Sequence, residues 1–356
     1  MRHNKPVNNQ LEPALAGALA ARADVFDPRY EAAYRLFNGF YESRPELVAD
    51  LYGRTLVLYN YADPPGEAEA VIEQATDFFQ KRLPGIRTVL VKTRHGGTDE
   101  EKKGIITWGI EPDKHVKENG VWYALSLQLN QDSSFYLDTR HLREWLKANL
   151  TGKTVLNTFA YTGSLGVAAK AGGAARVVHL DLKRAFLNVG KDSYLRNGFK
   201  IEREDFRTGD FWPQISRLKQ EDARFDCVLV DPPLFSHTRR GTVDLVESGE
   251  RVINKVRPLI ADGGFLVTIN NALFVPGAKY LETLNALCAD GYLSVEALIP
   301  VPQDFIGVPA PDASTLPADP VPFNHPTKIA ILRVRRKDAG QAAPVVIAEG
   351  ERKVEA

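Results

Sequence analysis

The sequence predicts an α/β protein in which a mostly parallel sheet, with helices on both faces, follows a smaller α+β domain. Two observations predict this arrangement. From about residue 140, short apolar runs alternate with helical stretches, which is typical of a parallel sheet covered on both faces. Before that point, strand-like runs and one helical period occur without regular alternation. A chain of 356 residues is long enough for about two domains.

The second domain is expected over residues 140–336. A helix over 141–150 is expected to end at Thr151-Gly152. Alternating strands and helices are then predicted, with strands at 154–160, 175–181, 225–231 and 264–270 and helices at 164–172 and 183–198. Strands at 292–300 and 328–336 complete the sheet as a final pair. The proline-rich stretch between that pair, 301–327, is long for a loop, which favours a functional or a disordered segment.

The smaller domain is expected over residues 29–139. Its predicted elements are strands at 54–62, 87–94, 104–110 and 121–129 and a helix at 67–83. Residues 1–28 are interpreted as an N-terminal appendage with one short amphipathic helix at 11–23, and residues 337–356 as a disordered tail.

Composition excludes several classes of protein. There is no run of about 18 apolar residues, so we expect no membrane span. The apolar part of the N-terminus is short and is interrupted by Glu12 and Pro13, which argues against a signal peptide. Cys227 and Cys288 lack metal-type spacing, so we expect a cytoplasmic protein without a metal site.

Charge is balanced overall but not along the chain. The 45 basic and 45 acidic side chains give a formal net charge of zero, whereas a protein that coats nucleic acid is usually basic. Residues 140–260, however, carry 21 Lys and Arg against 14 Asp and Glu. This local excess suits a polyanionic substrate, and an ordinary solvated surface explains it equally well.

Candidate ligand-binding residues follow the predicted strands, because ligands of such sheets bind at the carboxyl ends of the strands. In NTFAYTGSLG (157–166), Gly163 and Gly166 allow a tight turn and a close approach of the backbone to a ligand. The loop lacks the dinucleotide fingerprint G-x-G-x-x-G. Asp181 ends the next strand, where an acidic residue often binds a ribose, and Asp210 could accept a hydrogen bond from an adenine amine. A helix cap or turn is the alternative for both.

The sharpest motif is Asp231-Pro232-Pro233-Leu234-Phe235, directly beyond a predicted strand. Two prolines make a rigid turn that can direct carbonyl groups and an aromatic ring into a pocket. A planar base stacked on such a ring gains roughly 1–3 kcal/mol. A purely structural turn is the alternative.

With these residues the sequence resembles the class I S-adenosylmethionine (SAM)-dependent methyltransferases that modify bacterial large-subunit ribosomal RNA. NTFAYTGSLG, Asp181 and DPPLFS carry the resemblance, and so do three upstream segments in the same order: YRLFNGFYESRPELVADLYG (34–53), VLVKTR (89–94) and LSLQLNQDSSFYLDTR (125–140). The guanine-N7 module of the fused two-methyltransferase enzyme is most similar, followed by the 5-methylcytosine enzymes. The resemblance covers roughly 30–336 and implies a Rossmann-like SAM methyltransferase sheet of seven strands, with the last pair antiparallel.

The resemblance implies SAM as cofactor and RNA, in particular large-subunit ribosomal RNA, as partner. The loop NTFAYTG would hold the methionine part of SAM, Asp181 the ribose and Asp210 the adenine. The implied cofactor-binding residues are Phe135, Asp138, Arg140, Asn157, Phe159, Ala160, Tyr161, Thr162, Gly163, Ser164, Asp181, Leu182, Asp210 and Asp231. The implied catalytic residues are Asp231, Pro232, Pro233 and Phe235. Substrate contacts are implied for Phe235, Arg239, Arg240, Asn270 and Asn271, and the RNA would also use residues 29–139.

Departures from the family favour one chemistry. Methylation of pyrimidine carbon 5 needs a cysteine nucleophile, because a thiolate must first add at carbon 6. The corresponding positions here are Leu234 and residues 268–271 (TINN), while Cys227 and Cys288 fall within a strand and a helix. We therefore expect direct SN2 transfer onto guanine N7 of a flipped base. The alternatives are an exocyclic amine as target, a transfer RNA, protein or small-molecule substrate, a nicotinamide-dependent oxidoreductase, and a non-catalytic RNA-binding module.

Overall fold

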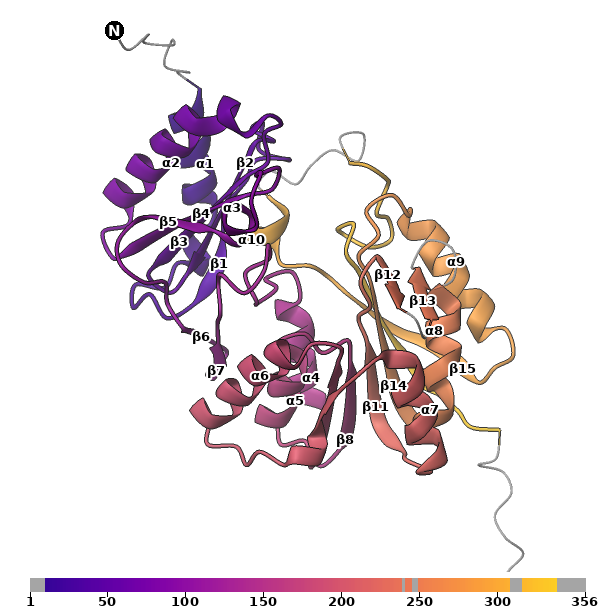
Figure 1. The fold of residues 1–356 in the computed structure, drawn as a ribbon. Coiled ribbons are helices and arrows are strands. Elements are labelled where there is room, and N and C mark those ends of the chain that lie inside the picture. The colour runs from indigo at the N-terminus through magenta and orange to yellow at the C-terminus, as the bar shows by residue number, and fades with distance from the viewer. Residues whose placement is uncertain (1–9, 239–240, 245–248, 308–315, 338–356) are drawn as a thin grey trace, which may run out of the picture.

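A computed structural model describes residues 10–238, 241–244, 249–307 and 316–337, which form two domains side by side (Figure 1). The smaller domain contains a five-stranded sheet in the order β1-β2-β3-β4-β5. These strands are β1 (Ala33–Asn38), β2 (Leu47–Tyr52), β3 (Thr55–Asn60), β4 (Thr88–Thr93) and β5 (Ile105–Trp108). Strands β3 and β4 are parallel, and the other neighbours are antiparallel.

Two helices supply one side of the core of the smaller domain. Helices α1 (Leu11–Ala21) and α2 (Glu69–Arg82) pack their apolar side chains with those of β1, β2 and β3 in one buried cluster. The predicted helix at 11–23 is therefore present, but it belongs to this core, so the boundary placed at residue 28 does not separate an appendage. A short helix, α3 (Asp99–Lys103), follows β4.

Three strands of this region were not predicted, and one predicted strand is shorter. Strands β1 and β2 are fully or almost fully buried although they contain Arg35 and Asp50, which pair with each other at 2.7 Å. The stretch expected to connect 104–110 and 121–129 contains β6 (His115–Glu118). It forms a separate hairpin with β7 (Val121–Ala124), which ends before the residues predicted to continue it.

The second domain confirms the predicted seven-stranded α/β sheet. Its strand order is β10-β9-β8-β11-β14-β16-β15, and β16 runs antiparallel to both of its neighbours. The strands are β8 (Thr154–Thr158), β9 (Arg176–Asp181), β10 (Phe206–Thr208), β11 (Phe225–Val230), β14 (Ile260–Asn270), β15 (Leu293–Ile299) and β16 (Lys328–Val334). The central strands are buried on both faces, which is why they appear in the sequence as uninterrupted apolar runs.

Helices cover both faces of this sheet. One face packs against α7 (Phe211–Gln220), α8 (Gly249–Val256) and α9 (Gly277–Cys288). The other packs against α4 (Arg140–Asn149) and α5 (Ser164–Ala171), with α6 (Arg184–Arg196) beside α5. A hairpin of β12 (Phe235–Thr238) and β13 (Gly241–Asp244) follows β11. The expected tail, 337–356, lies outside the described residues except for Lys337.

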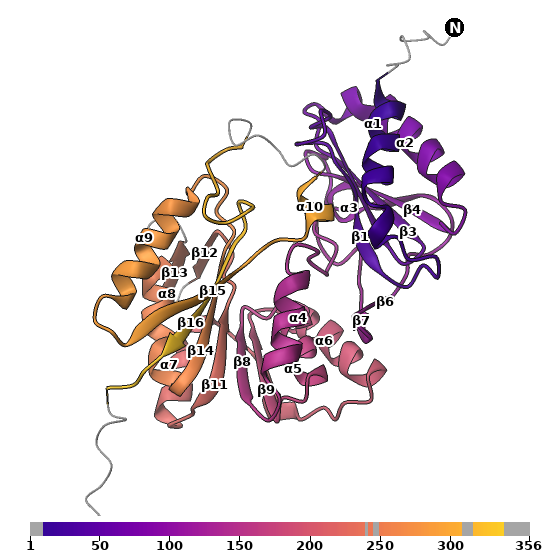
Figure 2. The ribbon, with the colours of Figure 1, turned by 180° about the vertical axis from the view of Figure 1, so that it is seen from behind.

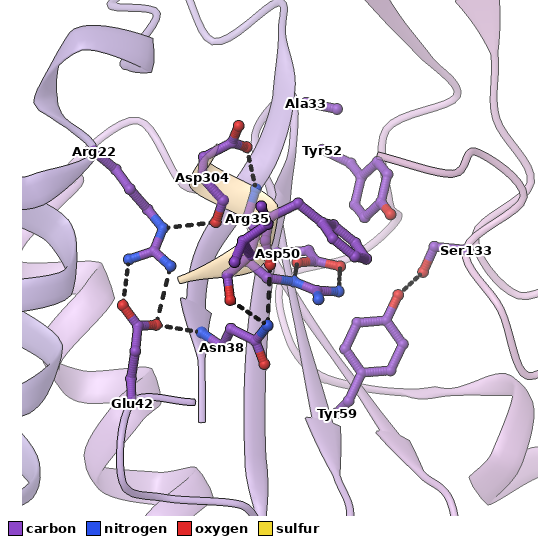
Figure 3. Close-up of polar contacts among 12 residues, drawn as sticks. Arg22, Ala33, Arg35, Asn38, Glu42, Asp50, Tyr52, Tyr59, Ser133 and Asp304 are labelled. Carbon is purple, nitrogen blue, oxygen red and sulfur yellow. Dashed lines mark hydrogen bonds and ion pairs between the residues drawn. The ribbon is translucent and has the colours of Figure 1, made fainter. Parts of the chain in front are cut away.

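The proline-rich stretch after β15 returns to the smaller domain. There it forms α10 (Gln303–Ile306), which lies against β1 in both views (Figures 1 and 2). The carboxylate of Asp304 accepts hydrogen bonds from the Arg35 amide and from both terminal nitrogens of the Arg140 guanidinium. Arg22 pairs with Glu42 and also donates to the Asp304 carbonyl (Figure 3). This buried network joins the two domains.

Candidate active site

A cavity of about 490 Å³ lies at the carboxyl ends of the parallel strands of the second domain. Its walls come from the turns after β8, β9, β10 and β11, from β14, and from the linker that precedes α4. The structure brings together eleven of the residues expected at the site: Asp138, Phe159, Tyr161, Asp181, Leu182, Asp210, Asp231, Pro232, Pro233, Phe235 and Asn271.

Other expected residues lie elsewhere. Phe135 and Ala160 are in the apolar core, and the Asn157 amide faces His179. The Thr162 hydroxyl donates to the Ser134 carbonyl, while Gly163 and Ser164 begin α5. The Asn270 side chain accepts from the Ala272 amide, and Arg140 pairs with Asp304. These eight residues were expected to contact cofactor or base, and their side chains do not line the cavity. Arg239 and Arg240 lie outside the described residues.

The turn between β8 and α5 has an unusual backbone. Phe159, Tyr161 and Gly163 have φ angles of 52°, 51° and 79°, in the left-handed region that favours glycine. A Cβ atom at Gly166 would lie 2.4 Å from the buried His179 ring, so a side chain does not fit there. The turn is stabilised by Asp181, whose Oδ2 accepts from the Tyr161 amide at 2.8 Å. The turn places the rings of Phe159 and Tyr161 in the cavity wall.

Asp181 and Asp210 are both turn or cap residues and cavity residues. Oδ1 of Asp181 accepts from the Lys183 amide at 2.9 Å, and Oδ1 of Asp210 accepts from the Trp212 amide at 2.9 Å at the start of α7. The alternative interpretation of Asp181 and Asp210 as turn or cap residues is therefore confirmed by these contacts. It does not exclude ligand binding, because a carboxylate has about four acceptor sites and both residues line the cavity.

Two further carboxylates, Asp138 and Asp231, line the cavity and influence each other electrostatically. Burial raises the pKa of Asp231 to about 8, and the charge of nearby Asp138 adds to this effect. Burial also raises the pKa of Asp138. Oδ2 of Asp138 accepts from the Thr327 hydroxyl at 3.0 Å, while its buried Oδ1 has no partner among the described residues. Two such groups favour a positively charged ligand between them.

Aromatic rings form much of the remaining wall. Phe159 stacks on Phe211 with ring centroids 4.6 Å apart. The buried Nε1 of Trp212 has no hydrogen-bond partner among the described residues. On the other side, Tyr161 lies between Tyr136 and Phe186, at centroid distances of 5.3 and 4.6 Å. These rings suit a flat heterocycle with polar edges.

Sequence reasoning missed several wall residues. Tyr136 lies two residues before Asp138 in the segment 125–140, and Phe211 and Trp212 directly follow Asp210, so each stands beside a predicted site residue. Asn130 lies in the linker, and Thr327 lies at the end of the proline-rich stretch. For Thr327 the sequence offers no local signal, because only the fold brings it to Asp138.

The described part of the chain shows neither a metal-ligand cluster nor a membrane-spanning helix. Within the described residues, no group of three or more His, Cys, Asp or Glu could hold a metal ion. No helix in the same residues is long and apolar enough to cross a membrane.

Comparison with known proteins assigns the fold and the cofactor. Residues 101–314 match a family described as S-adenosylmethionine-dependent methyltransferase. The chain belongs to this family. The enzyme is thus a methyltransferase that uses SAM, as the sequence motifs predicted, and neither an oxidoreductase nor a non-catalytic module. The cavity fits SAM, whose sulfonium and ammonium groups are cationic, because it offers the Asp138–Asp231 pair and two buried atoms, Asp138 Oδ1 and Trp212 Nε1, that have no hydrogen-bond partner among the described residues.

Relatives of this methyltransferase have informative names. The Photobacterium profundum protein "Ribosomal RNA large subunit methyltransferase I" is 26% identical, over 80% of this chain and 70% of its own. "Ribosomal RNA large subunit methyltransferase K/L" of Shewanella amazonensis is 29% identical, and the match covers 74% of this chain but 37% of that protein. YwbD of Bacillus subtilis, provisionally named a ribosomal RNA large subunit methyltransferase, is 28% identical over 82% of this chain and 74% of its own.

A solved structure agrees with the fold. The crystal structure of SMU.776 complexed with SAH superposes with a TM-score of 0.80 and covers 93% of this methyltransferase and 83% of that chain. The sequence identity is 20%, so this similarity supports the fold of both domains.

Proposed function

We propose that this methyltransferase modifies a base of large-subunit ribosomal RNA, with guanine N7 as the favoured atom. The observation that carries the proposal is the Asp231–Phe235 turn. Asp231 lies in the cavity, and the Phe235 ring, 61% exposed, stands at the cavity wall where an incoming base can stack on it. The three relatives described above all carry names that specify large-subunit ribosomal RNA, which supports the same substrate class.

In this proposal the cavity residues divide between cofactor and base. Asp181 binds the ribose of SAM, Asp210 the adenine amine, and the Asp138–Asp231 pair the cationic end. Phe159, Phe211 and Trp212 surround the adenine ring. Phe235 stacks on the target base, and the Asn271 amide reads its edge. Bound SAM supplies a methyl group on a positively charged sulfur.

The residues favour direct transfer. N7 of guanine has a lone pair, which forms the new carbon–nitrogen bond as the carbon–sulfur bond breaks. The electrons of that bond remain on sulfur, and the base takes the positive charge. No proton needs to be removed, so the protein's task is alignment and exclusion of water. Cys227 is fully buried within β11, burial raises the pKa of its thiol, and Cys288 is not a cavity residue.

An exocyclic amine is the second candidate, favoured by one observation. Asp231 immediately precedes the rigid Pro232-Pro233 turn, and its carboxylate can accept a hydrogen bond from an amine held against Phe235. Such a reaction would release one proton, because the attacking amine loses a hydrogen as its new bond forms.

The test is mass spectrometry of nucleosides from ribosomal RNA. The samples come from wild-type cells, a deletion strain, and the deletion strain carrying either the wild-type gene or Asp231→Ala. We expect 7-methylguanosine at one site to disappear on deletion and to return with the wild-type gene only. Loss of a methylated amino group would select the second candidate. An unchanged set of ribosomal nucleosides would contradict the ribosomal substrate.

A further inference from the structure

Three strands of the smaller domain end at the same edge of its sheet. Strands β1 and β3 each pair antiparallel with β2, so they run in the same direction, and β4 is parallel to β3. The carboxyl ends of the three strands therefore meet at one edge. Phe40, Tyr61 and Arg94 follow these ends within two residues. We call these three side chains the ring edge.

The ring-edge side chains contact one another and remain accessible. The rings of Phe40 and Tyr61 meet edge to face with centroids 4.7 Å apart. The Arg94 guanidinium lies over the Tyr61 ring at 5.4 Å, and over the Tyr59 ring beneath at the same distance. Phe40 is 46% exposed, and Tyr61 and Arg94 are half-buried. Tyr61 packs against the core of this domain with part of its ring, whereas Phe40 belongs to none of the described core clusters and leaves its ring open to solvent.

The ring edge is connected to the cavity of the second domain. Arg94 pairs with Asp132 at 3.2 Å, and the Tyr136 hydroxyl donates to the other oxygen of Asp132 at 3.1 Å. Tyr136 is 41% exposed and lines the cavity. The buried ammonium of Lys92 donates to the Asp132 carbonyl and so ties this linker to β4. Asp132 therefore links a residue of the cavity wall, Tyr136, to Arg94 of the ring edge.

We propose that the ring edge binds a nucleotide flanking the target base, in a single-stranded segment of the RNA substrate. This inference rests on the proposed RNA function and assigns part of the recognition to the smaller domain. Aromatic rings and guanidinium planes stack on unpaired bases, and they tolerate any base because every base has a π face.

The opposite edge of the same sheet provides a matched control. Trp108 ends β5 and pairs with Val89 near the start of β4, so it lies away from the ring edge. Its exposed fraction, 48%, is close to that of Phe40. Removing the Trp108 ring deletes an equally accessible aromatic surface from the same domain.

The test measures RNA binding by the full chain with fluorescence anisotropy. The probe is a fluorescein-labelled oligouridylate dodecamer at low salt, with a double-stranded RNA of equal length for comparison. Phe40→Ala and Tyr61→Ala should each raise the Kd for the single strand about fivefold or more. Phe40→Tyr, which keeps the ring, and Trp108→Ala should match the wild type. Calorimetry with SAM should give wild-type affinity for every variant, which verifies the fold.

The outcomes separate this inference from the proposed function. If the wild type binds the probe and the alanine variants bind it equally well, the ring edge does not contact RNA, whatever the substrate. A wild type that modifies ribosomal RNA but does not bind the single-stranded probe also overturns the inference. A wild type that neither binds the probe nor modifies ribosomal RNA contradicts the proposed function itself. If Tyr61→Ala loses affinity for SAM, the inference is tested by RNA binding of the Phe40→Ala and Phe40→Tyr variants only, because Phe40 is exposed.

Discussion

The hydroxyl of Thr327 donates a hydrogen bond to Oδ2 of Asp138 at 3.0 Å, although 189 residues separate the two in sequence. Thr327 immediately precedes β16, and Asp138 belongs to the linker before α4. The contact makes the carboxylate of a cavity residue depend on a segment that also forms α10. We therefore expect the affinity for SAM to depend on the proline-rich segment between β15 and β16, which ends at Thr327.

Replacing Thr327 by valine tests this dependence. The substitution keeps the shape of the side chain and removes the donor, so Oδ2 of Asp138 loses the hydrogen bond from Thr327, while Oδ1 already has no partner among the described residues. We expect the Kd for SAM, measured by calorimetry, to rise about two- to tenfold, the usual worth of one hydrogen bond. Thr327→Ser keeps the hydroxyl and should restore most of the affinity. Equal SAM affinity in the wild type and the valine variant would show that the contact does not orient Asp138.

Cofactor affinity should also depend on pH. In the free enzyme the pKa of Asp231 is raised to about 8, mainly by burial and further by Asp138, so the carboxyl holds a proton at neutral pH. A cationic ligand favours the ionised form. SAM binding should therefore release a proton from Asp231. The affinity for SAM should increase between about pH 6.5 and about pH 8.5, by at most tenfold per pH unit. Asp231→Asn should flatten this dependence, and a wild-type affinity that does not change with pH would contradict the assignment.

The ion pair of Asp304 with Arg140 should contribute far more to stability than an exposed pair of similar geometry. The Asp304 side chain is 3% exposed, so its removal leaves Arg140 partly buried without its main partner. We expect Asp304→Ala to lower the free energy of unfolding by about 3–5 kcal/mol in urea titrations. The control is Glu296→Gln, because Glu296 and Arg333 pair at 2.7 Å with both side chains about 40% exposed. This substitution should change the free energy of unfolding by no more than about 1 kcal/mol. Similar losses in both variants would mean that burial does not set the strength of the Asp304 pair.

Neither cysteine is expected to take part in methyl transfer. Cys227 lies in the core within β11, and Cys288 ends α9. A variant with both replaced by alanine should methylate ribosomal RNA at a rate close to that of the wild type, with stability lowered by the small cavity at Cys227. The measurement is transfer of labelled methyl groups from SAM to RNA. Complete loss of transfer in a folded variant that still binds SAM would point to pyrimidine chemistry through a thiolate.

The sheet of the second domain could be predicted because each central strand is a short apolar run between helices. The smaller domain was harder, and Arg35 and Asp50 show why. Each stands inside a buried strand, where it interrupts the apolar pattern, and each is tolerated there only because the other neutralises it at 2.7 Å. That pairing is a property of the folded sheet, so the strands β1 and β2 leave no clear signal in the sequence.

The sequence predicted cavity residues where a motif follows a strand and missed them where distant segments converge. Asp181, Asp231 and Phe235 line the cavity as expected, because the ends of parallel strands meet at one edge. Thr162 and Asn270 stand in the same motifs, yet their side chains turn toward the protein. Which side of a turn a residue faces depends on backbone angles such as those at Phe159 and Tyr161, and one sequence does not reveal them.

The position of β16 has a consequence for how the polypeptide is made. This strand is the last described element of the chain, yet it lies inside the sheet, between β14 and β15. While the chain emerges from the ribosome, β14 and β15 have no strand to join them until residues 328–334 have left the exit tunnel. The nascent catalytic domain therefore keeps an exposed apolar strand edge until that segment emerges, and chaperones protect such surfaces in the meantime.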